Sequence, residues 1–254
     1  MLTFSSAQLM GWIGMYLWPF LRVLSLFMAA PVFSDRAIPM RVKIGLGVAV
    51  AVVIAPTLPL QQQVSLDSAQ TFPLAVQQIM IGLALGFMVR LAMAGIEMAG
   101  ELIGLQMGLS FAGFFDPQSK QDGTAVGSWL GVIAMLIFLG INGHLLLIHT
   151  LTESFQSFPI GESMFSFHDI KSLIATGAEV FRLGLQLALP FIAVLLIVNL
   201  SLGVMVRVAP QLNLMSIGMP ATITTGFASL YLLMPYLEQP ITRALERGLA
   251  GLGR

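Results

Sequence analysis

The chain has 254 residues, of which 57% are apolar and only 9% are charged. Soluble globular proteins carry about 25% charged residues, so this composition cannot cover a surface exposed to water. The 12 Lys and Arg residues balance the 12 Asp and Glu residues, which excludes a basic surface for nucleic acid. The absence of cysteine excludes disulfides and thiol catalysis. The sequence therefore predicts a polytopic integral membrane protein.

Six apolar segments follow one another along the chain, separated by charged residues, proline and glutamine. About 20 apolar residues span a bilayer as a helix, and backbone amides in hydrocarbon must be paired within their own segment. We therefore predict an all-α fold, a single membrane domain over 1–254 built of about six helices arranged as hairpins. Pro19, Pro73, Pro190 and Pro220 are expected to kink these helices. The predicted segments are Leu9–Phe33, Ile44–Leu60, Phe72–Ala99, Val126–Leu151, Phe181–Val206 and Leu214–Tyr236.

Two features predict that some segments do not cross the membrane fully. The segment Ile44–Leu60 is short and ends in Pro56 and Pro59. The loop over residues 34–43 has a positive excess, which places it on the cytoplasmic side by the positive-inside rule. Six full crossings would then put the arginine-containing tail on the opposite side. The charge pattern is therefore inconsistent with six complete crossings.

Three charged residues, Arg90, Glu97 and Glu101, lie at spacings that place them on one face of the third helix, which includes the residues just after Ala99. A charge at the bilayer centre costs about 3 kcal/mol even on the most lenient scale, so this face must meet protein or water. Two interpretations remain open. The residues either form a structural network of buried polar contacts or act as a relay for protons or ions.

A run of small residues follows directly after the third segment, with Gly100, Gly104 and Gly108 four residues apart. This spacing removes side chains from one stripe of a helix and lets another backbone approach closely. The partner of the stripe is either another helix of this chain or another subunit.

Residues 105–122 are apolar but short, broken and rich in glycine, which predicts a loop buried at membrane depth. Such backbone is tolerated where protein covers it or where it lines a cavity. It is either a connector that shields itself with aromatic side chains or a channel plug, since Met and Phe side chains repack easily. The candidate plug residues are Met107, Gly108, Phe111, Gly113, Phe114, Phe115, Asp116 and Pro117.

The sequence gives no support for an enzyme, a metal site or a bound cofactor. His144 and His149 lie five residues apart, whereas helical metal ligands usually lie three or four apart. The stretch 108–112 resembles a serine nucleophile turn, but it lacks the final glycine and no strand precedes it. We therefore expect no catalytic residues and no cofactor.

Four landmarks in order resemble one known family over nearly the whole chain. The first runs from Arg22 through Pro31-Val-Phe to Ile38-Pro39-Met-Arg41-Val-Lys43, and the second from Glu101-Leu-Ile-Gly104-Leu-Gln106-Met107-Gly108 to Asp116-Pro117. The third joins Asn142-Gly143-His144 to Ser154-Phe155 and Pro159, and the fourth joins Leu200-Ser-Leu-Gly203 to Arg207-Val-Ala-Pro210-Gln211-Leu212-Asn213. Together they resemble the FliR family, the export-gate subunits of type III secretion systems.

The resemblance implies a non-enzymatic subunit of the bacterial inner membrane, located at the flagellar basal body. It implies one copy of this chain in a helical assembly with several FliP and FliQ subunits, and association with the proteins FlhB and FlhA. That assembly would pass unfolded flagellar proteins out of the cytoplasm. Two alternatives remain: the equivalent subunit of a virulence injectisome, and a secondary transporter for a small solute or ion, because transporters also use broken, charged helices.

The resemblance also implies roles for particular residues. The loop over 108–122 corresponds to the segment that plugs the channel in the family. Glu97 and Glu101 would face protein or the lumen. Arg207, Gln211 and Asn213 would form polar contacts with one another or with the backbone of partner subunits.

Overall fold

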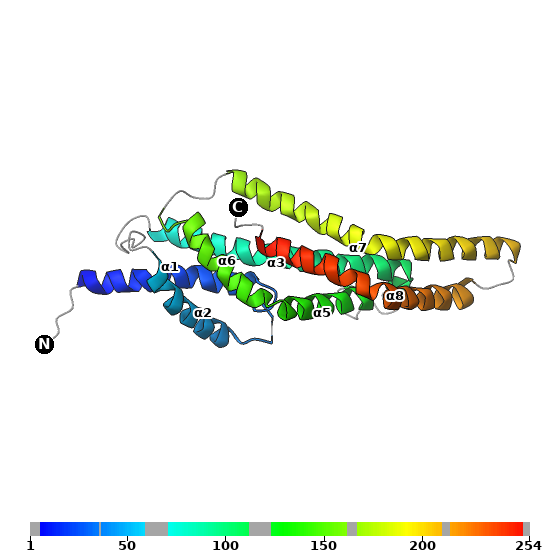
Figure 1. The fold of residues 1–254 in the computed structure, drawn as a ribbon, viewed down its shortest axis with the longest axis horizontal. Helices are drawn as coiled ribbons and strands as arrows, with labels where there is room; N and C mark the ends of the chain where they lie inside the picture. Colours follow the sequence, from blue (N-terminus) through cyan, green and yellow to red (C-terminus); the bar gives the residue numbers. More distant parts are fainter. Residues whose placement is uncertain are drawn as a thin grey trace. The chain divides into compact units, whose positions relative to one another are not determined.

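The computed structural model describes residues 6–35, 37–58, 71–111, 123–161, 167–209 and 214–250. The described residues form helices and no strand, which confirms the predicted all-α fold (Figure 1). The helices are α1 (Ser6–Ala29), α2 (Met40–Ile54), η1 (Ala55–Thr57), α3 (Thr71–Gln106), η3 (Leu109–Phe111), α5 (Ala125–Gly140), α6 (Gly143–Ser157), α7 (Phe167–Val208) and α8 (Leu214–Ala250). Of the prolines expected to kink helices, Pro19, Pro190 and Pro220 lie inside α1, α7 and α8.

Apart from the fourth, each predicted apolar segment corresponds to one long helix, and three of these helices run well past the predicted ends. Helix α3 continues from Ala99 to Gln106, α7 begins at Phe167 instead of Phe181, and α8 ends at Ala250. The predicted ends were placed where the run of apolar residues stops. That position indicates where the chain leaves the hydrocarbon, and it does not indicate where the helix ends. Backbone hydrogen bonds of a helix continue through polar residues such as Glu and Arg, which are good helix formers.

The fourth predicted segment, Val126–Leu151, is two helices instead of one. Helices α5 and α6 are separated at Ile141 and Asn142, where Asn142 takes a left-handed conformation with φ 56° and ψ 33°. Asparagine tolerates this region better than most residues, and a left-handed residue cannot continue a right-handed helix. The glycines on either side, Gly140 and Gly143, further weaken helix continuity.

Among the described residues, four helical stretches are long and apolar enough to cross a membrane. These are Met40–Thr57, Thr71–Gln106, Gly177–Val208 and Ile217–Gly248, and the broken pair α5 and α6 can be counted as a fifth. The apolar stretch Ile13–Ala29 is shorter. In the most apolar part of α3, 56% of the residues are buried, against 11% in α7. More than half of this part of α3 is therefore covered by the rest of the chain, whereas α7 presents most of its apolar side chains outward.

The helices group into two compact units. Unit 1 contains residues 1–91, 142–176 and 246–254, and unit 2 contains residues 92–141 and 177–245. The core of unit 1 includes the buried residues Trp18, Val23, Leu26, Phe27, Ile81, Leu85, Leu151 and Phe155. The core of unit 2 includes Ile96, Ile103, Met107, Leu130, Phe138, Phe191 and Leu195. The prediction of one membrane domain over 1–254 stays a prediction.

Candidate functional site

A buried arginine lies at the centre of unit 1. The side chain of Arg22, on α1, is fully buried. Its Nε donates to Gln78 Oε1 of α3 at 2.8 Å, and its Nη1 donates to the carbonyl oxygen and the hydroxyl of Ser154 at 2.9 and 3.1 Å. Its Nη2 donates to the carbonyl of Phe158 at 2.9 Å. The guanidinium also lies 3.9 Å from the centroid of the Phe155 ring.

The surroundings of Arg22 explain how a cation is stabilised there without a carboxylate among its described contacts. The carbonyls of Ser154 and Phe158 lie at the C-terminal end of α6, where the helix dipole is negative. The Ser154 carbonyl also accepts from the backbone N–H of Phe158 at 2.9 Å, so it is shared between that N–H and Arg22. The Phe155 ring adds a cation–π contact. Arg22 therefore joins α1, α3 and the end of α6 by hydrogen bonds.

Helices α1 and α3 cross closely beside this arginine. A Cβ atom on Gly82 would meet the hydroxyl of Ser25 and the carbonyl of Arg22, and one on Gly86 would lie 2.7 Å from Ala29 Cβ. Only glycine permits this approach, which brings Gln78, one turn earlier on α3, against Arg22. The side-chain nitrogens Trp18 Nε1 and Gln78 Nε2 are buried beside this crossing without a hydrogen-bond partner.

A second polar centre lies in unit 2, where α3 meets the beginning of α5. Both carboxylate oxygens of Glu101 accept from the backbone N–H of Thr124 at 2.8 Å. Thr124 is the N-cap of α5, and its hydroxyl accepts from the N–H of Gly127 at 3.1 Å. A carboxylate at this position also interacts favourably with the positive end of the helix dipole. Glu101 therefore fixes the start of α5 on α3.

Glycines on both helices make room for this contact. A Cβ atom on Gly100 would lie 2.5 Å from Gly127 Cα, and one on Gly104 would lie 2.5 Å from the Thr124 hydroxyl. On α5, Cβ atoms on Gly127 and Gly131 would meet the carboxyl groups of Glu101 and Glu97. Gly100 and Gly104 thus contact α5 of the same chain.

The residue that directly follows α3 is held by α8. Met107 is fully buried, and its carbonyl accepts from the hydroxyl of Thr222 at 3.0 Å. A Cβ atom on Gly226 would lie 2.5 Å from Met107 Cγ, so the methionine side chain lies directly on the α8 backbone. Gly108 follows with φ 81°, so it lies in a turn and not on the helical stripe predicted for it.

The other predicted polar residues are placed differently. Arg90 is exposed and has no ion pair in the described part of the chain, and Glu97 is exposed beside Gly131. Arg207, in the last turn of α7, is exposed as well. Among the described residues of the predicted network, Glu101 makes the hydrogen bonds to the start of α5 given above. The buried polar network, with burial of the two arginines by other subunits, stays a prediction. Gln211 and Asn213 lie outside the described residues.

Most of the predicted plug cannot be placed. Met107 and Gly108 are described above, and Phe111 ends the short helix η3. Gly113, Phe114, Phe115, Asp116 and Pro117 lie outside the described residues. The plug role of the segment over 105–122 stays a prediction.

Comparison with known sequences places the chain in a family. Residues 13–248 match the family described as bacterial export proteins, family 1. The chain belongs to this family. This confirms the resemblance drawn from the four sequence landmarks.

Three relatives with similar sequences each have the name flagellar biosynthetic protein FliR. The chain is 46% identical over 237 residues to a flagellar biosynthetic protein FliR of Pectobacterium carotovorum subsp. carotovorum, covering 93% of this chain and 90% of the relative. It is 45% identical over 237 residues to the protein of that name in Escherichia coli (strain K12), with the same coverage. A third, from Bacillus subtilis (strain 168), is 31% identical over 226 residues, covering 86% of this chain and 85% of the relative.

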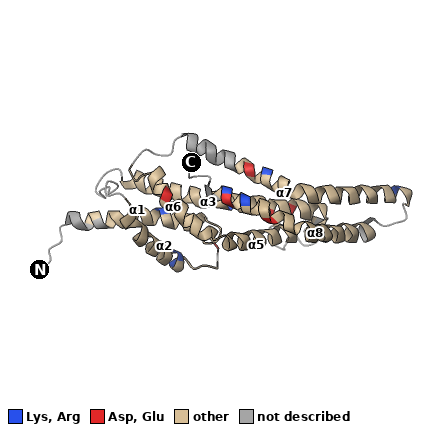
Figure 2. Ribbon diagram, in the orientation of Figure 1, with Lys and Arg blue, Asp and Glu red and all other residues tan. Residues whose placement is uncertain are grey.

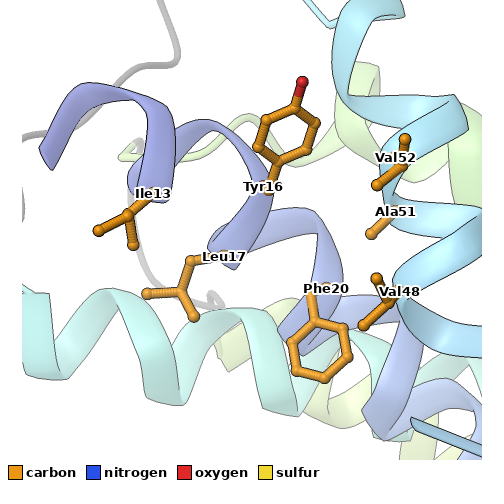
Figure 3. A pocket seen from close by; sticks show the side chains of 7 residues that line it. All are labelled: Ile13, Tyr16, Leu17, Phe20, Val48, Ala51 and Val52. Carbon is orange, nitrogen blue, oxygen red and sulfur yellow. The ribbon is translucent and has the colours of Figure 1, made fainter. Parts of the chain in front are cut away.

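Two grooves give this bacterial export protein apolar surfaces beside its helices. The first, of about 440 Å³, lies between α1 and α2, whose side chains converge on it in Figure 3. It is lined by Ile13, Tyr16, Leu17, Phe20, Val48, Ala51 and Val52. The second, of about 430 Å³, is lined by Ala125, Val126, Trp129, Phe227, Leu230, Tyr231 and Met234 of α5 and α8. Figure 2 shows that long stretches of α5, α7 and α8 carry no charge.

Arg22 is the residue that sequence reasoning missed in this family member. It was taken only as a landmark, although a lone arginine in the middle of an apolar helix is a recognisable signal of a buried polar contact. The glycines at and before the start of α5 were missed too, although Gly123, Gly127 and Gly131 repeat at four-residue spacing. Their partners, Glu101 and Glu97, were not predictable without the helix register in space. Among the described residues no group of three potential metal ligands occurs, and His149 lies 3.7 Å from Glu153 on an exposed face of α6.

Proposed function

We propose that this chain is a structural, non-enzymatic subunit of the flagellar type III protein export gate in the bacterial inner membrane. The observation that carries the proposal is the family match over residues 13–248, together with relatives named flagellar biosynthetic protein FliR at 45–46% identity. The match covers both compact units and all the helices that are long and apolar enough to span a membrane.

The gate requires partner subunits, and the outer surface of the chain supports such partners. Over residues 181–208, helix α7 exposes large apolar side chains, among them Leu185, Leu189, Ile197, Leu200, Val204 and Val208. Exposed apolar patches of this extent mark contacts with lipid or with other proteins. We propose that FliP and FliQ subunits cover part of these faces and that FlhB and FlhA associate with the resulting assembly at the flagellar basal body.

The segment over 105–122 is proposed to close the channel that this assembly forms. Apolar Met and Phe side chains would seal a narrow passage against ions, and glycines would let the seal deform when an unfolded chain passes. The burial of Met107 and the positive φ of Gly108 support a chain that turns inward at the end of α3.

Deleting the gene in its own bacterium tests the proposal. We expect loss of flagellar hook and filament proteins from the culture medium while their amounts inside the cell persist, with secretion restored by a plasmid copy. A Gly45→Ala copy is a matched control, because a Cβ atom there meets nothing within 4 Å. Normal secretion of flagellar proteins in the deletion strain would refute the proposed function.

Purification from native membranes distinguishes the gate from a transporter. A gate subunit should be recovered in a large complex with several other membrane subunits. Recovery as a lone monomer with saturable binding of a small solute would contradict the gate and support a transporter.

A further inference from the structure

Helix α2 carries a basic residue near its start and lines an apolar groove with α1 further along, both within unit 1. We propose that this groove binds one acyl chain of an anionic phospholipid and that Arg41 binds the phosphate of the same lipid. The site uses residues of α1 and α2 alone. It therefore goes beyond the proposed function and does not depend on it.

The groove suits a hydrocarbon chain by its lining and by its opening. All seven lining side chains are apolar except for the hydroxyl of Tyr16 (Figure 3). The volume of about 440 Å³ lies within the range of about 300–1,000 Å³ that is usual for small-molecule sites. Ile13, Val48 and Val52 line the groove and are nevertheless exposed, so it opens to the outside of the chain. An apolar occupant is favoured because it covers these side chains.

The size of the groove favours an acyl chain over a helix of another protein. On α2, the small residues Gly47 and Ala51 are buried, and a Cβ atom on Gly47 would lie 3.5 Å from the ring of Phe20 on α1. The two helices are therefore in contact beneath the groove. Ten residues of helix fill about 1,200 Å³, since a helix with side chains is about 10–12 Å wide. That volume exceeds the groove, whereas an acyl chain is much thinner.

Arg41 lies on the face of α2 that leads to the groove. It precedes Val48 by seven residues and Val52 by eleven, which are close to two and three helical turns. These spacings correspond to about 10 and 16 Å along the helix axis. Between them lies Gly45, where a Cβ atom would meet nothing within 4 Å, so the face is open. A lipid with its phosphate at Arg41 can therefore lay an acyl chain along this face into the groove.

The charge of Arg41 is available for a phosphate. Arg41 is exposed, and it makes no ion pair or hydrogen bond with another described residue. Lys43, by contrast, is buried and donates to the carbonyl of Asp35 at 3.1 Å. Arg41 lies at the beginning of the apolar stretch Met40–Thr57, where a span meets the headgroups. The positive-inside rule predicts the cytoplasmic side for this end, and basic residues there bind anionic headgroups.

Photoreactive lipids test the site. The full chain, with the subunits that co-purify with it from native membranes, is reconstituted into phosphatidylcholine vesicles that contain a small fraction of phosphatidylglycerol with a diazirine in its acyl chain. After irradiation, mass spectrometry measures the labelled peptides of α1 and α2. We expect about fivefold more labelling than with phosphatidylcholine carrying the same diazirine, because one arginine near the surface favours an anionic lipid by about that factor.

Variants of Arg41 test the headgroup contact. Arg41→Gln should lower labelling by phosphatidylglycerol about fivefold, to the level of phosphatidylcholine. Arg41→Lys should keep part of the preference, because an ammonium binds phosphate as a point charge without the planar fork. Arg243→Gln removes an exposed arginine of α8 and is the matched control, with no change expected. Equal labelling of the unchanged chain by the two lipids would overturn the role of Arg41.

Variants of the groove test the acyl-chain contact. Val52→Trp fills the groove from an exposed position, so it should lower labelling of α1 and α2 by both lipids. Val48→Trp does the same and provides the test if Val52→Trp does not accumulate. Val53→Trp is the matched control, because Val53 is exposed and does not line the groove. Labelling that is insensitive to both groove variants would overturn the proposed position of the acyl chain.

Two other occupants give distinct results. Inorganic phosphate, compared with chloride at the same ionic strength, should leave the preference for phosphatidylglycerol unchanged. Loss of the preference in phosphate would make a free phosphate the ligand of Arg41. The chain has no cysteine, so Val52→Cys provides a single thiol at the groove. Its disulfide crosslinking to a partner subunit, together with absence of lipid label from α1 and α2, would show a partner helix there and overturn the lipid site.

Discussion

At the scale of single residues, two charged side chains, Arg22 and Glu101, bind backbone groups at the ends of helices. Arg22 donates to the carbonyls at the end of α6, and Glu101 accepts from the N–H at the start of α5. The cation Arg22 binds the C-terminal end of α6, where the helix dipole is negative. The anion Glu101 binds the N-terminal end of α5, where the dipole is positive. Among the described residues, neither ion has an oppositely charged side chain as a hydrogen-bond partner. The protein thus uses helix ends as counter-ions.

Replacing Arg22 by Met is expected to destabilise unit 1 severely. The change leaves Gln78 Oε1 and the Ser154 hydroxyl in a buried site without their donor, and an unsatisfied buried polar group costs about 1–3 kcal/mol each. Arg22→Lys should rescue only in part, because an ammonium cannot reproduce the planar fork. The amount of protein in membranes and its thermal inactivation in detergent measure the effect. Arg41→Met, at an exposed position, is the control, and equal losses in the two variants would contradict the role of Arg22.

Replacing Glu97 and Glu101 together by Gln distinguishes a structural role of these carboxylates from a role as a proton or ion relay. Because Glu101 holds the start of α5, we expect weaker assembly with the partner subunits, measured by co-purification. A complex that assembles normally but no longer secretes would instead favour a proton or ion relay.

At the scale of elements, glycine sets how closely the helices approach. In unit 1, Gly82 and Gly86 of α3 meet α1, and in unit 2, Gly100 and Gly104 of α3 meet the start of α5. At Gly82, Gly86 and Gly100 a Cβ atom would meet backbone atoms, which cannot move aside as the end of a flexible side chain can. Close approach of this kind drives helix association in membranes, where lipid tails are as apolar as the helices.

Gly100→Ala should destabilise unit 2 even though alanine is the better helix former. Overpacking at such a contact costs about 1–3 kcal/mol, which exceeds the gain in helix propensity of about 1 kcal/mol. Gly203→Ala is the matched control on α7, because a Cβ atom there meets nothing within 4 Å. The control should be neutral or slightly more stable in a thermal inactivation assay. A Gly100→Ala protein as stable as the control would refute the close crossing of α3 and α5.

The break between α5 and α6 depends on the left-handed conformation of Asn142. Asn142→Gly should be tolerated, because glycine adopts this conformation freely. Asn142→Val should cost about 1–2 kcal/mol, since a left-handed residue with a branched side chain clashes with the following carbonyl. The difference in thermal inactivation between the two variants measures the strain, and equal stabilities would show that the break does not require it.

At the scale of the whole molecule, apolar side chains cover much more of the outside than is usual for a soluble protein. The large exposed apolar residues extend over every long helix and both grooves. A surface of this kind is stable only against lipid or other apolar helices. Figure 2 shows charged residues on the last turns of α8, whereas α5 carries none.

Deletion of Gly108–Asp116 is expected to make membranes leak ions and small solutes when the partner subunits are present. The deletion removes the segment proposed to seal the channel. Conductance or dye release of vesicles that contain the complex measures the effect. Vesicles with this chain alone should not leak, and unchanged conductance of the deleted complex would remove the plug role.

Part of the site was open to prediction from sequence because its signals are local. The spacing of Gly100 and Gly104 predicted a close helix contact, and Glu101 was expected to meet protein. Which helix they meet was not predictable, because Thr124 and Gly127 become neighbours only when the chain turns back. The role of Arg22 depends in the same way on Ser154 and Phe158, more than a hundred residues away.

The sequence by itself determined that the protein is helical, apolar and a member of an export family. Composition and periodicity are properties of each segment by itself, and the family landmarks are short stretches of sequence. None of these signals depends on contacts between distant segments. Only the tertiary structure decided where the helices end, that Val126–Leu151 breaks at Asn142, and which backbone groups Arg22 and Glu101 satisfy. These features depend on contacts between distant segments, because a buried charge is stable only where several helices bring enough partners to it.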